Sequence, residues 1–125
     1  MTRFVDKYPS EKRSNESGRI RAKYSDRVPC IIERADVKSD APSIQRCKFL
    51  VPSDTTAAAL LYIVRKRFVG DFDSSQSLYM FIRPAAGRGT PVLAPTASTI
   101  GSMDDLYKNS DGFLYIEYAT ESTFG

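Results

Sequence analysis

The stretch "SDTTAAALLYIVRKRFVGD" (residues 53–71) carries the strongest helical pattern in the chain. Its apolar residues recur at spacings of three and four, as they do on one side of an α-helix. Ser53 or Asp54 is expected to cap the helix, and Gly70 is expected to end it. We therefore predict a helix over residues 54–69, around which the remaining elements are arranged.

This helix is apolar on more than one side. The first apolar stripe consists of Ala57, Leu61, Val64 and Phe68. A second stripe, about 100° round the axis, consists of Leu60, Ile63 and the stem of Arg67. One stripe can cover a sheet, and the other is expected to lie beside a neighbouring strand.

Four segments have the composition of strands: 27–35, 46–52, 77–82 and 112–119. The segment 112–119 is apolar nearly throughout, which predicts a central strand that is buried on both faces. The first two strands are expected to form a hairpin through a turn-rich connection.

The strand 46–52 has two different sides. Lys48 and Leu50 lie on one side of the pleat with Pro52, and Phe49 and Val51 lie on the other. Its basic residues and its terminal proline are typical of an edge strand. An edge strand beside an uncovered apolar helix stripe would form a groove for an added peptide strand. The plainer alternative is that both stripes belong to the core and that the lysine only opposes aggregation.

Two further helices are predicted before the first strand, over residues 2–8 and 10–24, with Ser10 as the cap of the second. Residues 83–99 are predicted to be a long loop, and 99–109 a short helix. Without the N-terminal helical extension (1–25), the order is ββαβαβ. This order predicts one α+β domain over residues 1–125, a ubiquitin-like β-grasp with a four-stranded mixed sheet.

The composition argues against an enzyme. The chain of 125 residues contains no histidine, which excludes Ser-His and Cys-His nucleophile pairs and His-ligated metals. No glycine-rich phosphate loop is present, so no cofactor or metal is expected. Cys30 and Cys47 are expected to be free thiols in a reducing compartment. The longest apolar run, 57–64, is too short to span a bilayer, so a cytoplasmic protein without a signal peptide is expected.

The basic charge is concentrated at the N-terminus. Residues 1–34 contain nine Lys/Arg and five Asp/Glu, whereas residues 35–125 contain nine and ten. This excess supports an alternative hypothesis, an adaptor that binds microtubules or other acidic partners without being conjugated. Nucleic acid is not expected, because no aromatic residues interleave with the basic ones. The basic residues of the predicted second helix are Lys12, Arg13, Arg19, Arg21 and Lys23.

Several blocks of the sequence are similar to one family throughout the chain. They are "PSEKRSNESGRIRAKYSDRVPCIIERA", "KFLVPSDTT", "YIVRKRF", "STIGSMDDLY" and "GFLYIEYATESTFG". With these blocks the chain resembles the autophagy ubiquitin-like modifiers, the GABARAP and microtubule-associated light-chain proteins. The stretch 83–95 is longer than the loop usual in that family, and Leu60 stands where the family often has an aromatic residue.

The resemblance implies a modifier rather than a catalyst. A cysteine protease would expose the C-terminal glycine, which activating and conjugating enzymes would transfer to phosphatidylethanolamine on autophagosomal membranes. Gly125 would be the conjugated residue, carried with Phe124 on a flexible tail over residues 120–125. Phe124 and Gly125 would be recognised by the protease and the activating enzyme. The protein would be cytoplasmic when free and bound to the autophagosome membrane when lipidated.

The resemblance also implies two pockets for acidic receptor peptides of the form aromatic-x-x-aliphatic. Pocket one, for the aromatic residue, would comprise Glu16, Ile20, Pro29, Ile31, Lys48, Leu50 and Phe113. Pocket two, for the aliphatic residue, would comprise Phe49, Val51, Pro52, Leu60, Ile63 and Val64. The acidic flanks of the peptide would meet Arg46, Lys48 and Arg67. Tubulin would be a further acidic partner.

Overall fold

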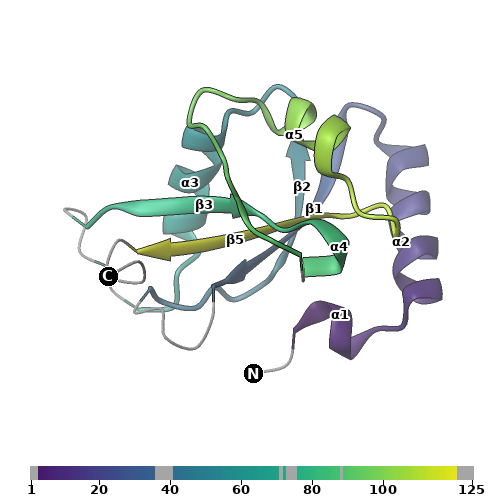
Figure 1. The fold of residues 1–125 in the computed structure, drawn as a ribbon, viewed down its shortest axis with the longest axis horizontal. Helices are drawn as coiled ribbons and strands as arrows, with labels where there is room; N and C mark the ends of the chain where they lie inside the picture. Colours follow the sequence, from purple (N-terminus) through teal and green to yellow (C-terminus); the bar gives the residue numbers. More distant parts are fainter. Residues whose placement is uncertain (1–2, 36–40, 71, 73–75, 88, 121–125) are drawn as a thin grey trace.

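The computed structural model describes residues 3–35, 41–70, 72, 76–87 and 89–120, which form a sheet flanked by helices (Figure 1). Along the chain, two helices precede the first strand, and the main helix follows the second strand and precedes the third. The elements are α1 (Phe4–Lys7), α2 (Ser10–Lys23), β1 (Arg27–Arg34), β2 (Lys48–Pro52), α3 (Ala57–Lys66), β3 (Leu78–Ile82), α4 (Pro84–Gly87), β4 (Val92–Leu93), α5 (Ile100–Tyr107) and β5 (Leu114–Thr120).

The strands form one mixed sheet in the order β2-β1-β5-β3-β4. β1 pairs antiparallel with β2 and parallel with β5, and β3 pairs antiparallel with both β5 and β4. Every residue of β5 is buried, which confirms the prediction of a central strand covered on both faces. The α+β class is confirmed, and β2 lies at the edge of the sheet as expected.

The predicted strand count of four is wrong, because the sheet has five strands. The segment 83–99, predicted to be a loop, contains both α4 and β4. β4 is only two residues long and pairs Leu93 with Phe81 and Val92 with Ile82. A strand of two residues among prolines and glycines is too short to show an alternating pattern in the sequence. It is identified by its pairing with β3 in the structure.

Two predicted helix caps are also wrong. α3 begins at Ala57, and its cap is Thr56, whose side chain accepts a hydrogen bond from the Ala59 N–H at 3.2 Å. Ser53 and Asp54 instead form the turn before α3, where the Ser53 carbonyl accepts the Gly101 N–H of α5 at 2.8 Å. Tertiary contact with α5 therefore delays the start of the helix. The predicted cap Ser10 is itself the first residue of α2 and makes no capping bond.

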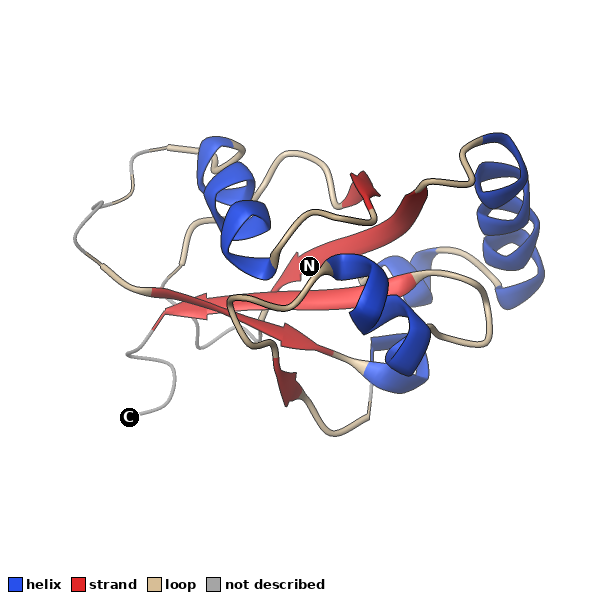
Figure 2. Cartoon of the chain, turned by 90° about the horizontal axis from the view of Figure 1, so that it is seen from above, coloured by secondary structure: helices blue, strands red, loops and turns tan. Residues whose placement is uncertain are grey.

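The two faces of the sheet bury separate hydrophobic clusters, and Figure 2 shows helices on both sides of the strands. The larger cluster joins α3 to the sheet and contains Leu114, Ile116 and Tyr118 of β5. The smaller cluster contains Phe4 of α1 and Tyr115 of β5 on the opposite face. The alternation of β5 side chains thus serves two cores.

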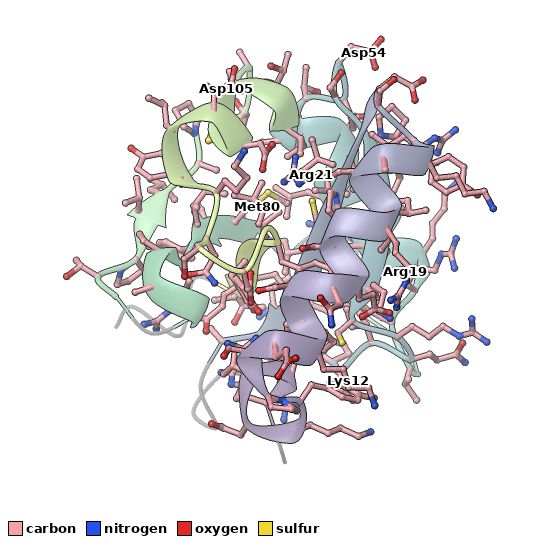
Figure 3. The ribbon with its side chains drawn as sticks, turned by 90° about the vertical axis from the view of Figure 1, so that its right-hand side faces the viewer. Lys12, Arg19, Arg21, Asp54, Met80 and Asp105 are labelled. Atoms are coloured by element: carbon pink, nitrogen blue, oxygen red, sulfur yellow. The ribbon has the colours of Figure 1, made fainter. Side chains whose placement is uncertain are left out.

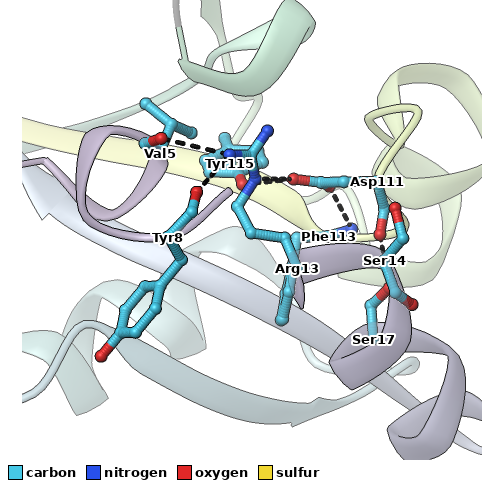
Figure 4. Close-up of polar contacts among 8 residues, drawn as sticks. All are labelled: Val5, Tyr8, Arg13, Ser14, Ser17, Asp111, Phe113 and Tyr115. Carbon is cyan, nitrogen blue, oxygen red and sulfur yellow. Dashed lines mark hydrogen bonds and ion pairs between the residues drawn. The ribbon is translucent and has the colours of Figure 1, made fainter. Parts of the chain in front are cut away.

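A buried ion pair fastens α2 to the loop before β5 (Figure 4). The Arg13 guanidinium donates to the Asp111 carboxylate at 2.8 Å and to the carbonyls of Val5 and Tyr8 at 3.1 and 2.6 Å. Asp111 also accepts the Tyr115 hydroxyl at 2.6 Å. These bonds link α1, α2 and β5 through one carboxylate.

Two further contacts continue this attachment along α2 at four-residue spacing. The Ser17 hydroxyl donates to the Asp111 carbonyl, and Arg21 pairs with Asp104 at 2.8 Å and bonds the Gly112 carbonyl. Gly112 has a φ of +92°, and a Cβ there would lie 2.2 Å from the Ser17 hydroxyl. This position therefore requires glycine, which lets α2 pack directly against the loop.

We predict that Asp111→Asn lowers the free energy of unfolding by about 3 kcal/mol at neutral pH, because it leaves the Arg13 guanidinium buried without its anion. Urea unfolding followed by circular dichroism measures the change. Asp105→Asn is the matched control, because Asp105 is exposed on α5 and has no partner among the described residues. Equal stability of Asp111→Asn and the parent chain would contradict the assigned role.

The Arg13–Asp111 ion pair also predicts that the stability of the fold depends on pH. Burial alone would raise the pKa of Asp111, but hydrogen bonds from Tyr115, the Phe113 N–H and Arg13 outweigh it and hold the pKa below its ordinary value. The stabilisation is therefore present above about pH 3.9, the ordinary pKa of aspartate, and is lost as the pH falls through the lower folded value. The difference in the free energy of unfolding between Asp111→Asn and the parent chain should therefore become smaller in that acidic range.

Candidate functional site

The exposed edge of β2 is the centre of the candidate site. β2 pairs with β1 on one side only, so its other side has no strand partner in the described sheet. Lys48, Leu50 and Pro52 are exposed on one face, whereas Phe49 is half-buried and Val51 buried on the other. The alternation predicted for this strand is therefore present, and the free edge can accept backbone hydrogen bonds from an added strand.

A hollow of about 350 Å³ lies between β2 and α3. The second stripe predicted for the helix lines this hollow, with Leu60 and Ile63 on α3 and Arg67 at its C-cap. The predicted end of the helix at Gly70 is wrong, because α3 ends at Lys66. Leu60 is fully buried and Ile63 is partly exposed, so the stripe closes the core and also forms an apolar wall. The full lining is Arg46, Lys48, Phe49, Leu50, Val51, Pro52, Leu60, Ile63 and Arg67.

Five of the six residues predicted for pocket two line this hollow. The sixth, Val64, does not line it: its side chain is fully buried in the core between α3 and the sheet. Helical geometry explains the difference, because Val64 follows Ile63 by 100° and so points towards the strands.

The residues predicted for pocket one gather between α2 and the opposite face of β2. Leu50 lies opposite Pro29 in the β1–β2 ladder, and Lys48 lies opposite Ile31. Glu16 of α2 forms an ion pair with Lys48 and so connects the helix to the edge strand. Ile31 and Phe113 are fully buried, with Ile20 packed against them. The exposed members are thus Leu50 and Lys48, above an apolar floor.

A second hollow, of about 430 Å³, lies beneath α1 and was not predicted from the sequence. It is lined by Phe4, Lys7, Tyr8, Gln45, Arg46, Cys47 and Lys48. A smaller one of about 240 Å³ adjoins it along α2, lined by Tyr8, Lys12, Arg13, Glu16, Arg19 and Lys48. The larger hollow depends on α1 folding back over residues 45–48, whereas the smaller one lies between α2, Tyr8 and Lys48. The only sequence signal was the four-residue spacing of Phe4 and Tyr8, which marks an apolar helix face.

Several of the basic side chains around these hollows make no ion pair with a described residue. Arg46 and Arg67 are exposed and make no ion pair within the described ranges. Lys7 and Lys12 both lie against the Tyr8 ring, 5.6 and 5.3 Å from its centroid. The edge of β2 is therefore electropositive, which favours acidic ligands.

The basic residues of α2 divide into two groups. Arg13 and Arg21 pair with Asp111 and Asp104 inside the structure, and Figure 3 shows Arg21 on the α5 side of α2. Lys12 and Arg19 lie away from that side (Figure 3), and Lys23 is exposed. Two of the five charges that suggested an adaptor thus hold the helix in place.

The remaining chemistry of the described residues is sparse. Burial raises the pKa of the Cys30 and Cys47 thiols, so both stay protonated at neutral pH. Within the described ranges, no cluster of His, Cys, Asp or Glu could hold a metal ion, and no helix is long and apolar enough to cross a membrane. Phe124 and Gly125 lie outside the described residues, as does the rest of the predicted tail 120–125 except Thr120. The prediction is wrong at Thr120, which is fully buried as the last residue of β5.

Comparisons with known proteins agree on one family. The model of the family "Autophagy protein Atg8 ubiquitin like" matches residues 12–125. Autophagy-related protein 8d of Arabidopsis thaliana is 41% identical over 125 residues, covering 100% of this chain and 96% of that protein. Autophagy-related protein 8A of Oryza sativa subsp. japonica is 42% identical over 124 residues, covering 99% and 96%.

A solved structure shows the same fold. The crystal structure of Trypanosoma brucei ATG8 superposes with a TM-score of 0.82 at 30% identity, and the match covers 100% of this chain and 99% of that one. The full-length identity to the plant proteins and the family match agree with this superposition. The chain therefore belongs to the Atg8 family of autophagy ubiquitin-like proteins.

Proposed function

We propose that this chain is a modifier that is conjugated through Gly125 to phosphatidylethanolamine and that recruits autophagy receptors to the modified membrane. Membership of the Atg8 family supports the proposal. The block that ends in Phe124 and Gly125 resembles the C-terminal block of the family, in which a glycine would be conjugated. A cysteine protease would prepare the terminus, and activating and conjugating enzymes would attach the lipid. The diacyl anchor would hold an otherwise cytoplasmic protein on the autophagosome membrane.

The observation that supports receptor binding is the unpaired edge of β2 with apolar surface on both sides. The hollow beside α3 includes Ile63, and the opposite face presents Leu50 above the buried pair Ile31 and Phe113. A strand added to this edge would place successive side chains on opposite faces of the sheet. A bound peptide can therefore use both surfaces at once.

This geometry explains an aromatic-x-x-aliphatic motif. Residues i and i+3 of a strand differ by an odd number, so their side chains point to opposite faces. Pocket one meets β2 at Lys48 and Leu50, and pocket two extends to Val51 and Pro52. The hollow of pocket two itself borders β2 from Lys48 to Pro52. We place the aliphatic anchor at its Pro52 end, so that the peptide would run from the first pocket to the second, parallel to β2.

The free cations along this edge favour an acidic peptide. Arg46 and Arg67 flank the hollow beside α3, and Lys48 stands between the two pockets. Glu16 already pairs with Lys48, so an acidic peptide residue would have to compete with Glu16 for the Lys48 ammonium group. Arg46 and Arg67 have no such internal competitor in the described part of the chain.

We predict that Leu50→Ala weakens the binding of a W-x-x-L peptide about tenfold, because it removes an exposed apolar residue that the aromatic anchor would cover. Isothermal titration calorimetry measures the affinity. Leu106→Ala is the matched control, because Leu106 is 73% exposed on α5 and lines none of the hollows at β2. Unchanged affinity of Leu50→Ala, with an intact circular dichroism spectrum, would argue against pocket one.

A separate prediction concerns conjugation. Gly125→Ala should abolish lipid attachment, because a Cβ at the reacting residue obstructs the narrow clefts of the conjugating enzymes. Reconstitution with these enzymes and phosphatidylethanolamine vesicles, read as a shift in gel mobility, tests it. Peptide affinity should stay unchanged, which shows that the variant is folded. A lipid-modified Gly125→Ala product would refute the assignment of the terminal glycine.

A further inference from the structure

We infer that the hollow beneath α1 is a third peptide subsite, which takes an apolar side chain two residues before the aromatic anchor. The inference rests on the proposed function, since it extends the same bound strand. It assigns this chain a preference for peptides in which one apolar residue interrupts the acidic flank. Binding of the acidic flank and the two anchors alone would not give rise to such a preference.

The hollow has an apolar floor and a charged rim. Phe4 is 5% exposed, and Tyr8 and Cys47 are half-buried against the same cluster as Ile31 and Phe113. The rim is formed by exposed polar side chains, Lys7, Gln45, Arg46 and Lys48. A fully acidic side chain would meet the rim but leave the floor uncovered, whereas a leucine or methionine would cover it.

The hollow adjoins the groove along β2. Arg46 and Lys48 line both this hollow and the one beside α3. The hollow also lies on the pocket-one face of the sheet, because Phe4 and Cys47 belong to the cluster that underlies pocket one. A peptide that leaves pocket one in the direction of Cys47 therefore passes over it.

The register of an added strand selects one position. A peptide parallel to β2 has the residues before its aromatic anchor beside residues 45–47. Side chains two positions apart share a face, so position −2 points to the same face as the anchor and lies beside Cys47. Positions −1 and −3 point the other way. Arg46 and Arg67, which line the hollow beside α3 on that other side, make acidic residues at −1 and −3 compatible with the apolar one.

Cys47 makes the subsite measurable without altering the protein. Its side chain is half-buried in the hollow, whereas Cys30 is fully buried, so a thiol reagent should modify Cys47 selectively. A side chain seated in the hollow should slow that modification. The rate of maleimide labelling, read by mass spectrometry of the intact chain, therefore reports occupancy of the proposed subsite.

The experiment compares three W-x-x-L peptides with otherwise acidic flanks: leucine at −2, leucine at −3, and alanine at both positions. Leucine at −2 should bind about five- to tenfold more tightly than the alanine peptide, as expected for burying one aliphatic side chain. It should also slow labelling of Cys47 at equal saturation. Leucine at −3 should gain no more than about twofold, because it faces away from the hollow.

The outcomes separate this inference from the proposed function. If the alanine peptide binds but leucine at −2 brings neither tighter binding nor slower labelling of Cys47, the third subsite is wrong and the two-pocket groove stands. Equal gains at −2 and −3 would show a general apolar preference and would also overturn the subsite. If none of the peptides binds, the proposed receptor-binding function fails, and the subsite fails with it.

Discussion

The burial of β5 on both faces is the constraint on which the rest of the structure depends. A central strand that is buried on both faces needs cover on two sides, and α3 covers one side while α1 and α2 cover the other. Because these helices extend towards β2, the edge strand lies between two helical layers. The hollows at its two faces are spaces that those layers leave open, and so the proposed binding surface follows from the packing of the core.

Charged residues have two separate tasks in this arrangement. Arg13 and Arg21 form ion pairs with Asp111 and Asp104, and these pairs hold α2 against the loop before β5. Among the described residues, Arg46 and Arg67 near the β2 edge make no ion pair, whereas Lys48 pairs with Glu16. The net charge of a segment therefore does not predict where this molecule is electropositive. Some of the basic residues in the N-terminal third stabilise the fold, and Arg46 and Arg67, which lie outside that third, contribute to the electropositive edge.

The sequence was informative where a pattern spans many residues. The apolar run at 112–119 predicted a doubly covered strand, and the alternation before Pro52 predicted an edge strand. It was uninformative where a tertiary contact decides. α3 begins at Ala57, after the Thr56 cap, because the preceding turn binds α5, and β4 is recognised as a strand by its pairing with β3. The hollow beneath α1 could not be predicted for the same reason, since it needs Phe4 and Cys47 to meet across the fold.

The central claim is that the edge of β2 binds an acidic aromatic-x-x-aliphatic peptide with its anchors in apolar surroundings. The chain has no tryptophan, so the indole of a W-x-x-L peptide would be the only one in solution. The most direct measurement is the emission wavelength of that indole as the protein is titrated in, beside a peptide with alanine at both anchors. The account predicts a saturable blue shift that is absent from the control peptide. No shift at high protein concentration would contradict it.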